Sequence, residues 1–573
     1  MFGVDTSGEI NGEEVKNQIL EKFWKFANCY HVSGDKSSSI WFLMDEMGSA
    51  VGHSSEPNVV CVPFMFIQPP PSGSLSAQPQ LTSFSIMWPV RDIDFEDYVE
   101  RDYCPWITTP IDRIAHLADW INGIDEDLIA QLTKGAEYHE ELLSEITNKG
   151  GSFDINIFEG RGNPTFVTNR QAPVSPPSLW EGKILKVYTT AYDPLRLRSE
   201  HGGLTHASFT LVDSKEEADI LWLSDPVKPD EAAEFWLSST ENDQSQTVRF
   251  VNQFPYEGLF CLKDNLTREI ARCLGSPSWW KPTFDLETQL PLFVGHYLNS
   301  QKKQQDIAVQ SISGAVHNKD YNIWIAKPNN STRSVGHVVS SSLIRIIRSL
   351  EIDKSRIVQK YIEKPLLFQG KYKFDMRFVV LVRSLELGKE EVYVYNDFWC
   401  RVANKSHHIE TTSSVSESDE GTTNLNRAVL EDPESYLTAA YVLPGVQQRA
   451  KIPSCDDVIA SLMDSYPFLD WNKIYENICN MLRELFLGLP RGQEGKMHAP
   501  KARALYGCDV MLEAVTNSFG EVIDAQPKLL EVTFTPSNNA TMVDTFEKIY
   551  PSYVNDVFGC LFLGEQVNVK RLL

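Results

Sequence analysis

The chain has 573 residues, of which 42% are hydrophobic and 23% are charged, and its formal net charge is −24. This composition is typical of a globular protein with ample core, and the length predicts about three to four domain-sized units. The acidic balance argues against nonspecific binding to nucleic acids or to anionic membranes, so neither is expected as a partner. The ten cysteines include no C-x-x-C pair and no Cys/His cluster at zinc spacing, which favours reduced thiols in a cytoplasmic protein, with a nuclear location also open.

The N-terminal third predicts a β-rich domain with some helices. The first residues lack a basic n-region and an apolar h-region, so no signal peptide is expected. The predicted elements are a helix over residues 10–30, strands over Ile40–Met44, Val59–Ile67 and Ser83–Trp88, and helical segments within 110–148. The stacked prolines and serines of Pro173–Ser178 then predict a linker.

After the linker, strands separated by helix-length segments predict an α/β unit. The predicted strands are Ile184–Tyr188, Asp219–Leu223, Val248–Phe254, Ile323–Pro328, Glu391–Tyr395, Gly507–Leu512 and Lys528–Phe534. Helices are predicted over Ser341–Leu350 and from Asp470 onward, and a loop over Arg491–Ala499. The segment 409–424, rich in Ser, Thr and acids, predicts a mobile loop.

The stretch Lys373-Phe374-Asp375-Met376-Arg377 alternates charged with apolar residues. On a strand, alternate side chains face opposite ways, so the three charges would share one face. Charges on a strand that runs into an apolar segment are costly unless they line a cleft or find partners. A phosphate chain with a divalent metal would suit Lys, Arg and a carboxylate together. An exposed strand face is the alternative that the spacing leaves open.

Further candidates lie on other predicted strands. Lys327 ends an apolar strand just before Pro328 and could reach a phosphate, or could lie in water. The apolar-flanked segment Gln359-Lys360-Tyr361-Ile362 could hold a purine whose edge is read by backbone groups, or could be a core strand. Asp509 and Glu531 are single acids inside apolar strands, and a shared metal or separate local salt bridges would satisfy them.

Taken in order, these motifs resemble the ATP-grasp domain of the tubulin–tyrosine ligase family, from about Lys183 to Phe562. The resemblance also includes Val251-Asn-Gln-Phe-Pro255 with Lys263, and Asn396-Asp-Phe-Trp-Cys-Arg401. It implies a ligase fold that uses ATP and Mg²⁺ to activate a carboxylate as an acyl phosphate, which an amine then attacks. It also implies tubulin or microtubules as the partner.

The resemblance assigns a role to each candidate residue. It implies ATP contacts for Lys327, Gln359, Lys360, Tyr361, Ile362, Lys373 and Asp375. It implies that Arg377 and Arg401 lie at the phosphate or acyl-phosphate site as catalytic residues, and that Asp509 and Glu531 bind magnesium.

The last motif departs from the family pattern. The family normally has Glu-x-Asn there, whereas this chain has Glu531-Val532-Thr533, and a hydroxyl binds magnesium less well than an amide oxygen. Water can fill part of a Mg²⁺ shell, so we expect nucleotide binding to survive better than acyl-phosphate chemistry.

The N-terminal residues resemble a SET-like domain that precedes the ligase-like domain in part of this family, on Trp41–Ser49 and Met87–Asp92. The heptapeptide Gly52–Asn58 is similar to the Asn-His-Ser-Cys signature of lysine methyltransferases. However, Gly52 stands where Asn belongs and Ser55 where Cys belongs, and glycine cannot supply the side-chain hydrogen bonds of Asn. We therefore expect a degenerate SET-like domain used for packing or for binding partners, with histones among the candidates.

The predicted fold is mixed α/β, with a degenerate SET-like, β-rich domain over residues 1–178 and a tubulin–tyrosine ligase-like domain over 179–573. The latter divides into an α/β subdomain over 179–300 and ATP-grasp subdomains over 301–573. The predicted function is that of an ATP-binding, weak or inactive ligase that regulates tubulin modification through binding. The alternatives are an active ATP-dependent ligase of tyrosine or glutamate to tubulin or another protein and, more remotely, a SET-type lysine methyltransferase.

Overall fold

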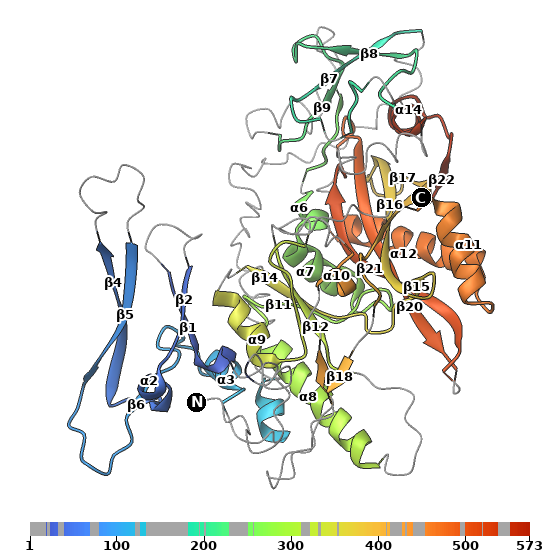
Figure 1. Cartoon of the computed structure of the whole chain (residues 1–573). Coiled ribbons are helices and arrows are strands. Elements are labelled where there is room, and N and C mark those ends of the chain that lie inside the picture. Colours follow the sequence, from blue (N-terminus) through green and yellow to red (C-terminus); the bar gives the residue numbers. More distant parts are fainter. Residues whose placement is uncertain are drawn as a thin grey trace. The chain divides into compact units, whose positions relative to one another are not determined.

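Figure 1 shows the computed structural model of the chain. The structure describes residues 19, 23–31, 39–68, 80–120, 126–132, 182–193, 195–199, 202–227, 250–255, 257–310, 321–329, 334–351, 355–407, 410–412, 427–429, 433–438, 453–492, 499–517, 520–536 and 551–573. The predicted linker at 173–178 lies outside these residues, so the domain boundary stays a prediction.

The chain divides into two compact units that are each described by themselves. The first consists of Met1–Glu140, Leu286–Lys303 and Ser342–Ser355, and the second of Glu141–Asp285, Gln304–Ser341 and Arg356–Leu573. No helix among the described residues has both the length and the apolar character needed to cross a membrane.

The first unit contains pairs of strands. β1 (Ala27–His31) pairs antiparallel with β2 (Ser39–Leu43), and β4 (Val59–Gln68) pairs antiparallel with β5 (Gln80–Pro89). The short strands β3 (Gly52–His53) and β6 (Glu100–Arg101) pair in parallel, and the helices are α2 (Glu46–Ala50) and α3 (Pro110–Leu117). β2, β4 and β5 confirm the three strands predicted in this region, and α3 confirms a helix within 110–148.

The helix predicted over residues 10–30 is wrong at its C-terminal end. Residues 23–26 are helical, but the five residues that follow form β1. The cause is tertiary pairing, because Ala27 lies opposite Leu43 and Tyr30 lies opposite Ile40 in the ladder with β2. Cross-strand partners can override a local helical pattern, and the apolar spacing of one segment cannot reveal them.

The second unit contains a parallel sheet with the strand order β10-β9-β7-β8. Its strands are β7 (Leu185–Thr189), β8 (Phe209–Val212), β9 (Ile220–Trp222) and β10 (Phe250–Val251). β7 and β9 confirm two predicted strands, while β10 covers a small part of the predicted strand Val248–Phe254. All three residues of β9 are buried, as expected for an inner strand of a parallel sheet.

An antiparallel sheet in the same unit has the order β11-β14-β12-β13. Its strands are β11 (Thr283–Asp285), β12 (Trp324–Pro328), β13 (Val338–Ser340) and β14 (Arg356–Lys360). β12 confirms the predicted strand that ends at Lys327-Pro328. The predicted purine-binding segment begins in β14 and continues beyond it, because the strand ends at Lys360.

The large antiparallel sheet of this unit has the order β21-β20-β16-β17-β22, with β15 beside β16. Its strands are β15 (Leu367–Phe368), β16 (Tyr372–Ser384), β17 (Glu391–Val402), β20 (Ala504–Thr516), β21 (Val522–Phe534) and β22 (Val569–Arg571). β17, β20 and β21 confirm the predicted strands and are longer than predicted, since each continues past its apolar run.

Both faces of the large sheet are buried, which fixes its charged residues in place. Along β16, Phe378 and Val380 belong to one core, and Val379 and Leu381 belong to another. The helices of the first core include α7 (Lys263–Leu274), α11 (Cys455–Ser465) and α12 (Trp471–Gly492), and Figure 1 shows α11 and α12 beside the sheet. The second core contains residues of the parallel sheet, of α14 (Tyr553–Phe558) and of the π-helix η5 (Gly559–Leu563).

The other helices complete the comparison with the sequence. α9 (Leu343–Arg348) with η3 (Ser349–Glu351), and α12, confirm the predicted helices. α12 includes Arg491 and Gly492, so the loop predicted from Arg491 starts later. The predicted mobile loop at 409–424 contains a short strand, β18 (Glu410–Thr412), and its other residues lie outside the described part. The remaining elements are α6 (Gly258–Cys261), α8 (Leu290–Gln310), α10 (Pro433–Tyr436) and β19 (Arg427–Val429).

Candidate functional site

The strands that carry the predicted site residues converge on one cavity of the second unit. The cavity lies between β12 and β14 of the smaller antiparallel sheet and β16, β17, β20 and β21 of the large one. It is lined by the following predicted residues: Lys327, Gln359, Lys360, Tyr361, Ile362, Lys373, Asp375, Arg401, Asp509 and Glu531. Arg377, the remaining predicted residue, is not among the lining residues but binds one of them.

Lys327 is held in the cavity wall by neutral oxygens. It is 5% exposed, and its Nζ donates to Oε1 of Gln359 at 2.8 Å and to the carbonyl of Leu530 at 3.2 Å. Gln359 donates from Nε2 to the hydroxyl of Thr283 at 3.0 Å, which fixes the orientation of its amide. Burial lowers the pKa of Lys327 to about 8, although Glu531 opposes this change. The ammonium is therefore poorly neutralised in this structure.

Lys373 is more deeply buried and has fewer partners. It is 2% exposed, and its Nζ lies 3.6 Å from the centroid of the Tyr361 ring, a cation–π contact. Among the described residues, no oxygen accepts a hydrogen bond from this ammonium. Burial holds the pKa of Lys373 well below its usual range, and Asp375 only partly opposes it. A second poorly neutralised cation thus faces the same cavity.

The register of the large sheet builds an ion-pair network beside these lysines. Asp375 on β16 lies opposite Arg401 on β17, and Arg377 on β16 lies opposite Asp509 on β20. Arg377 donates from two nitrogens to the two oxygens of Asp509, at 2.6 and 2.9 Å. Arg401 donates to Oδ1 of Asp375 at 2.8 Å and also to Oδ2 of Asp509. Such charge-assisted bidentate pairs are among the stronger hydrogen bonds in proteins.

The pKa values of the two carboxylates in this network are shifted in opposite directions. Burial raises the pKa of Asp375, and Arg401 and a side-chain hydrogen bond from Thr438 partly oppose this change. Burial would also raise the pKa of Asp509, but Arg377 and Arg401 hold that pKa well below its usual range. Both oxygens of Asp509 are therefore bound to guanidinium groups, and the two arginines predicted to act on phosphate are bound to carboxylates.

Glu531 is the predicted acid that remains outside this network. It lies opposite Asp509 across β20 and β21, and Nζ of Lys263 on α7 lies 3.6 Å from its carboxylate. Thr533 lies opposite Gly507 and is not among the lining residues. Within the described part of the chain, no group of three His, Cys, Asp or Glu side chains is placed to hold a metal ion. Magnesium binding by Asp509 and Glu531 stays a prediction.

The predicted purine-binding segment Gln359–Ile362 already uses some of its polar groups within the protein. Nζ of Lys360 donates to Glu363 at 2.7 Å, so this ammonium is neutralised by a neighbouring carboxylate. The backbone N–H of Lys360 donates to Pro282, and that of Tyr361 donates to the carbonyl of Ile323 at 3.0 Å. Backbone recognition of a base would therefore rely on the other groups of this segment.

The sequence did not reveal several residues that line the cavity, among them His337 and the segment Tyr436–Thr438. His337 directly precedes β13, so a histidine ten residues beyond Lys327 was the available signal. Tyr436–Thr438 gave no signal, because the segment that carries it has no apolar period.

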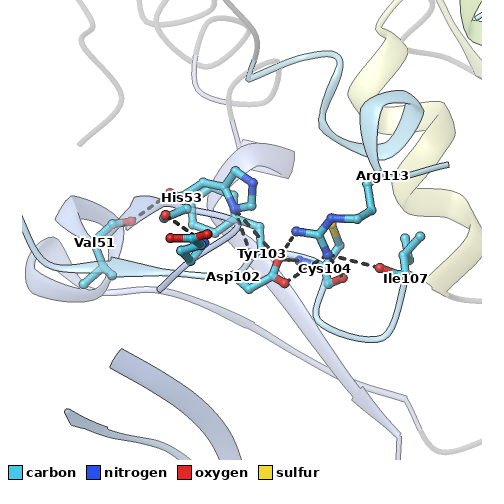
Figure 2. A network of polar contacts seen from close by, with 9 residues as sticks. Val51, His53, Asp102, Tyr103, Cys104, Ile107 and Arg113 are labelled. Carbon is cyan, nitrogen blue, oxygen red and sulfur yellow. Dashed lines mark hydrogen bonds and ion pairs between the residues drawn. The ribbon is translucent and has the colours of Figure 1, made fainter. Parts of the chain in front are cut away.

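A separate polar network in the first unit surrounds His53 of the altered heptapeptide (Figure 2). Arg113 binds both oxygens of Asp102 at 3.0 Å and also donates to two backbone carbonyls. Nδ1 of His53 accepts the N–H of Tyr103 at 3.2 Å, and burial lowers the pKa of this imidazole, against the opposing effect of Asp102. These contacts hold neighbouring segments of the first unit together, and the role of the domain in packing or in binding partners stays a prediction.

Comparisons with known proteins give the family. A family model described as the tubulin-tyrosine ligase family matches residues 240–568, which is more than half of the chain. The chain belongs to the tubulin–tyrosine ligase family. A second model, the tubulin tyrosine ligase SET-like domain, matches residues 1–123. The predicted family and the predicted order, a SET-like domain followed by a ligase-like domain in a mixed α/β fold, are therefore confirmed.

Named relatives of this tubulin–tyrosine ligase family member match it over nearly the whole chain or over part of it. The human protein named tubulin–tyrosine ligase-like protein 12 is 29% identical over 577 residues, covering 99% of this chain and 76% of the relative. The Caenorhabditis elegans protein of the same name is 27% identical, covering 96% of this chain and 73% of the relative. Tubulin glycylase 3E of Tetrahymena thermophila is 29% identical over 227 residues, covering 38% of this chain and 14% of the relative.

Proposed function

We propose that this family member binds ATP in the cavity between the two antiparallel sheets, has weak or no ligase activity, and regulates tubulin modification through binding. The observation that carries the proposal is the contrast between the two lysines and the two arginines of the site. Lys327 and Lys373 are buried cations that lack a carboxylate hydrogen-bond partner in the described structure. Arg377 and Arg401 are bound to carboxylates.

Nucleotide binding is supported by the unfavourable free energy of burying Lys327 and Lys373 without a carboxylate hydrogen-bond partner. Removing an ammonium from water is unfavourable unless it is paired, and burial lowers the pKa of both Lys327 and Lys373. A phosphate chain would supply the missing negative charge. The segment Gln359–Ile362 adds two groups that could contact a base: the ring of Tyr361 and the N–H of Ile362, which no described carbonyl accepts. The donor set of the cavity therefore fits a nucleoside triphosphate.

A metal ion held by the protein fits this donor set less well. The oxygens of Asp509 accept from Arg377 and Arg401, and the carboxylate of Glu531 lies near Lys263. Mg²⁺ prefers oxygen ligands in near-octahedral geometry and is often bound through one or two carboxylates plus the phosphates of the substrate. We therefore propose that magnesium enters with the nucleotide and is held mainly by its phosphates, with Glu531 as the nearest acid of the protein.

Weak or absent ligase activity is supported by the same contacts. An acyl phosphate would need arginines free to bind its developing charge, whereas Arg377 and Arg401 neutralise Asp509 and Asp375. Thr533 replaces the amide that the family pattern places last. The competing function, an active ATP-dependent amino-acid ligase, is favoured by the presence of both arginines and both acids in one place.

Tubulin is the proposed partner, because relatives of this chain are named as a tubulin glycylase and a tubulin polyglutamylase. Family membership supports this partner at the level of class. Binding of histones, a cytoplasmic location, and the remote alternative of lysine methylation by the SET-like domain stay predictions.

The proposal is tested with the purified full-length chain and tubulin. Calorimetry should detect ATP binding, and a radiolabelled amino-acid assay should detect little or no ATP-dependent transfer to tubulin. Co-sedimentation should detect binding to tubulin. Efficient transfer that Glu531→Gln abolishes would establish the active ligase instead, and absence of ATP binding would remove the proposed function altogether.

A further inference from the structure

Residues 334–337, just before β13, are held next to the cavity by several backbone contacts. The N–H of His337 donates to the carbonyl of Ser334 at 3.3 Å, and NH1 of the buried Arg356 donates to the carbonyl of Gly336 at 2.7 Å. Gly336 has φ +72°, and a Cβ there would approach Cγ of Pro328 to 3.1 Å. Glycine is needed at this point for both reasons, so the backbone next to His337 has one defined position.

The imidazole of His337 lines the cavity with an unused ring nitrogen. Its Nδ1 is shielded from solvent and has no hydrogen-bond partner among the described residues. Buried polar groups are nearly always paired, so an exception calls for an explanation. A ligand that accepts a hydrogen bond would provide the missing partner.

The charges around this imidazole are mainly positive. Burial, followed by Lys327 on β12, Lys263 on α7 and Arg356 on β14, holds the pKa of His337 well below its usual range. The acids that line the same cavity are Asp375, Asp509 and Glu531, of which the first two are bound to arginine. The ring is therefore neutral at pH 7 in this structure. An anion placed among these cations would favour the protonated form.

We propose that His337 donates a hydrogen bond to the phosphate chain of the bound nucleotide, and that its imidazole takes up a proton from solvent when the nucleotide binds. This inference rests on the proposed function and extends it in two ways. It names His337 as a residue that binds phosphate, and it couples nucleotide binding to the uptake of a proton. His337 would act as a binding residue rather than as an acid or base in any covalent step. His337 lines the same cavity as Lys327, and its Nδ1 has no partner among the described residues, so this nitrogen is available to the phosphates of a nucleotide held by that lysine.

Calorimetric titration with ATP in buffers of different ionisation enthalpy measures the protons taken up on binding. The wild-type chain should take up more protons than His337→Gln, by up to about one per nucleotide, and its affinity should fall with rising pH by up to about tenfold more per pH unit. Proton uptake by the lysines or by ATP itself is common to both proteins and cancels in the difference. His206→Gln, which removes a histidine paired with Glu565 outside the cavity, should behave as wild type.

The outcomes separate the two proposals. If both proteins bind ATP with equal proton uptake and equal pH dependence, the role of His337 is refuted while the proposed function stands. If the wild-type chain binds no ATP, both are refuted. If His337→Gln fails to fold, NMR of wild-type protein labelled in its twelve histidines decides. One imidazole whose pKa rises on addition of ATP supports the inference, and no change in any of them overturns it.

Discussion

Replacing Lys373 by methionine separates a ligand-binding role of this residue from a structural one. Methionine is close to lysine in length and apolar, so it can fill the same space beside Tyr361 without the charge. In the proposed function, Lys373 contributes to nucleotide binding but destabilises the fold when no nucleotide is bound. The substitution should therefore weaken ATP binding and, at the same time, stabilise the fold.

The expected loss of affinity follows from one charge-assisted contact. Such a contact contributes about 1.5–3 kcal/mol, which corresponds to a loss of roughly 10- to 150-fold in the dissociation constant. Titration calorimetry with ATP measures this directly. The contact lies in a buried site, since Lys373 is 2% exposed, so salt should screen it only weakly.

The effect on stability compares two opposing terms. Each unit by which burial lowers the pKa of Lys373 corresponds to about 1.4 kcal/mol, whereas a desolvated cation–π contact contributes about 2 kcal/mol. Burial is the largest influence on the pKa of Lys373 and lowers it, so we expect the cost of desolvating the ammonium to exceed the gain from the ring. Lys373→Met should raise the free energy of unfolding by about 0.5–2 kcal/mol at pH 7, the range of substitutions that exchange function for stability.

The direction of the pKa shift of Lys373 determines how the stability of the wild-type chain changes with pH. A lysine whose pKa is lowered by folding is protonated in the unfolded chain over a range in which the folded chain has lost the proton, so wild-type stability rises with pH. The advantage of Lys373→Met in urea unfolding should shrink as the pH approaches about 10, near the pKa of an unperturbed lysine. An advantage that is constant with pH would mean that packing, not charge, produces it.

Lys360→Met is the matched control, because Lys360 lines the same cavity but neutralises Glu363. Losing this partner leaves a carboxylate that is 8% exposed, which should cost about 1–3 kcal/mol of stability with little effect on ATP affinity. If Lys373→Met is instead destabilised and binds ATP as wild type does, Lys373 is a structural residue and the proposed phosphate site is misplaced.

Three further substitutions test the acids. Asp509→Asn should lower the free energy of unfolding by about 3–5 kcal/mol, because it leaves two guanidinium groups, only 14% and 15% exposed, short of a carboxylate; a urea midpoint close to that of wild type would contradict the network. Glu531→Gln should change the affinity for MgATP by less than about tenfold, whereas the loss of a metal-supporting group would cost about 10- to 100-fold. Asp102→Asn should lower the stability of the first unit by about 1–3 kcal/mol, seen as lower protection from hydrogen exchange, and ATP affinity should not change.

The sequence predicted which residues would meet but not how they would pair. The alternation from Lys373 to Arg377 has a period of two, and a strand converts that period into a shared face, so this part of the site could be read locally. Arg377 and Asp509 are 132 residues apart, and they pair because β16 and β20 are neighbours in one register. No local pattern encodes this register, so the sequence left both a shared metal and a local salt bridge open for Asp509, and only the family resemblance implied the metal; its arginine partners could not be identified.

Other parts of the fold illustrate the same limit. β16 could be predicted because its apolar run needs burial on both faces, and two cores provide it. β1 was predicted as a helix because its partner strand, β2, lies beyond it in the sequence. His337 was missed because a single histidine has no period, and its position depends on a turn held by Arg356.

Nucleotide binding and ligase chemistry differ in the ion pairs that each would have to break. A phosphate chain can neutralise Lys327 and Lys373 without disturbing any ion pair of the described site. An acyl phosphate needs Arg377 or Arg401, and releasing either from Asp509 breaks a buried pair, at a cost of about 3–5 kcal/mol unless the new anion replaces it. Asp509 can therefore be understood as a residue that positions the arginines. Asp509 keeps the side chains of Arg377 and Arg401 against the sheet. A substrate that displaces Asp509 would need to present a comparable bidentate anion to the same guanidinium groups.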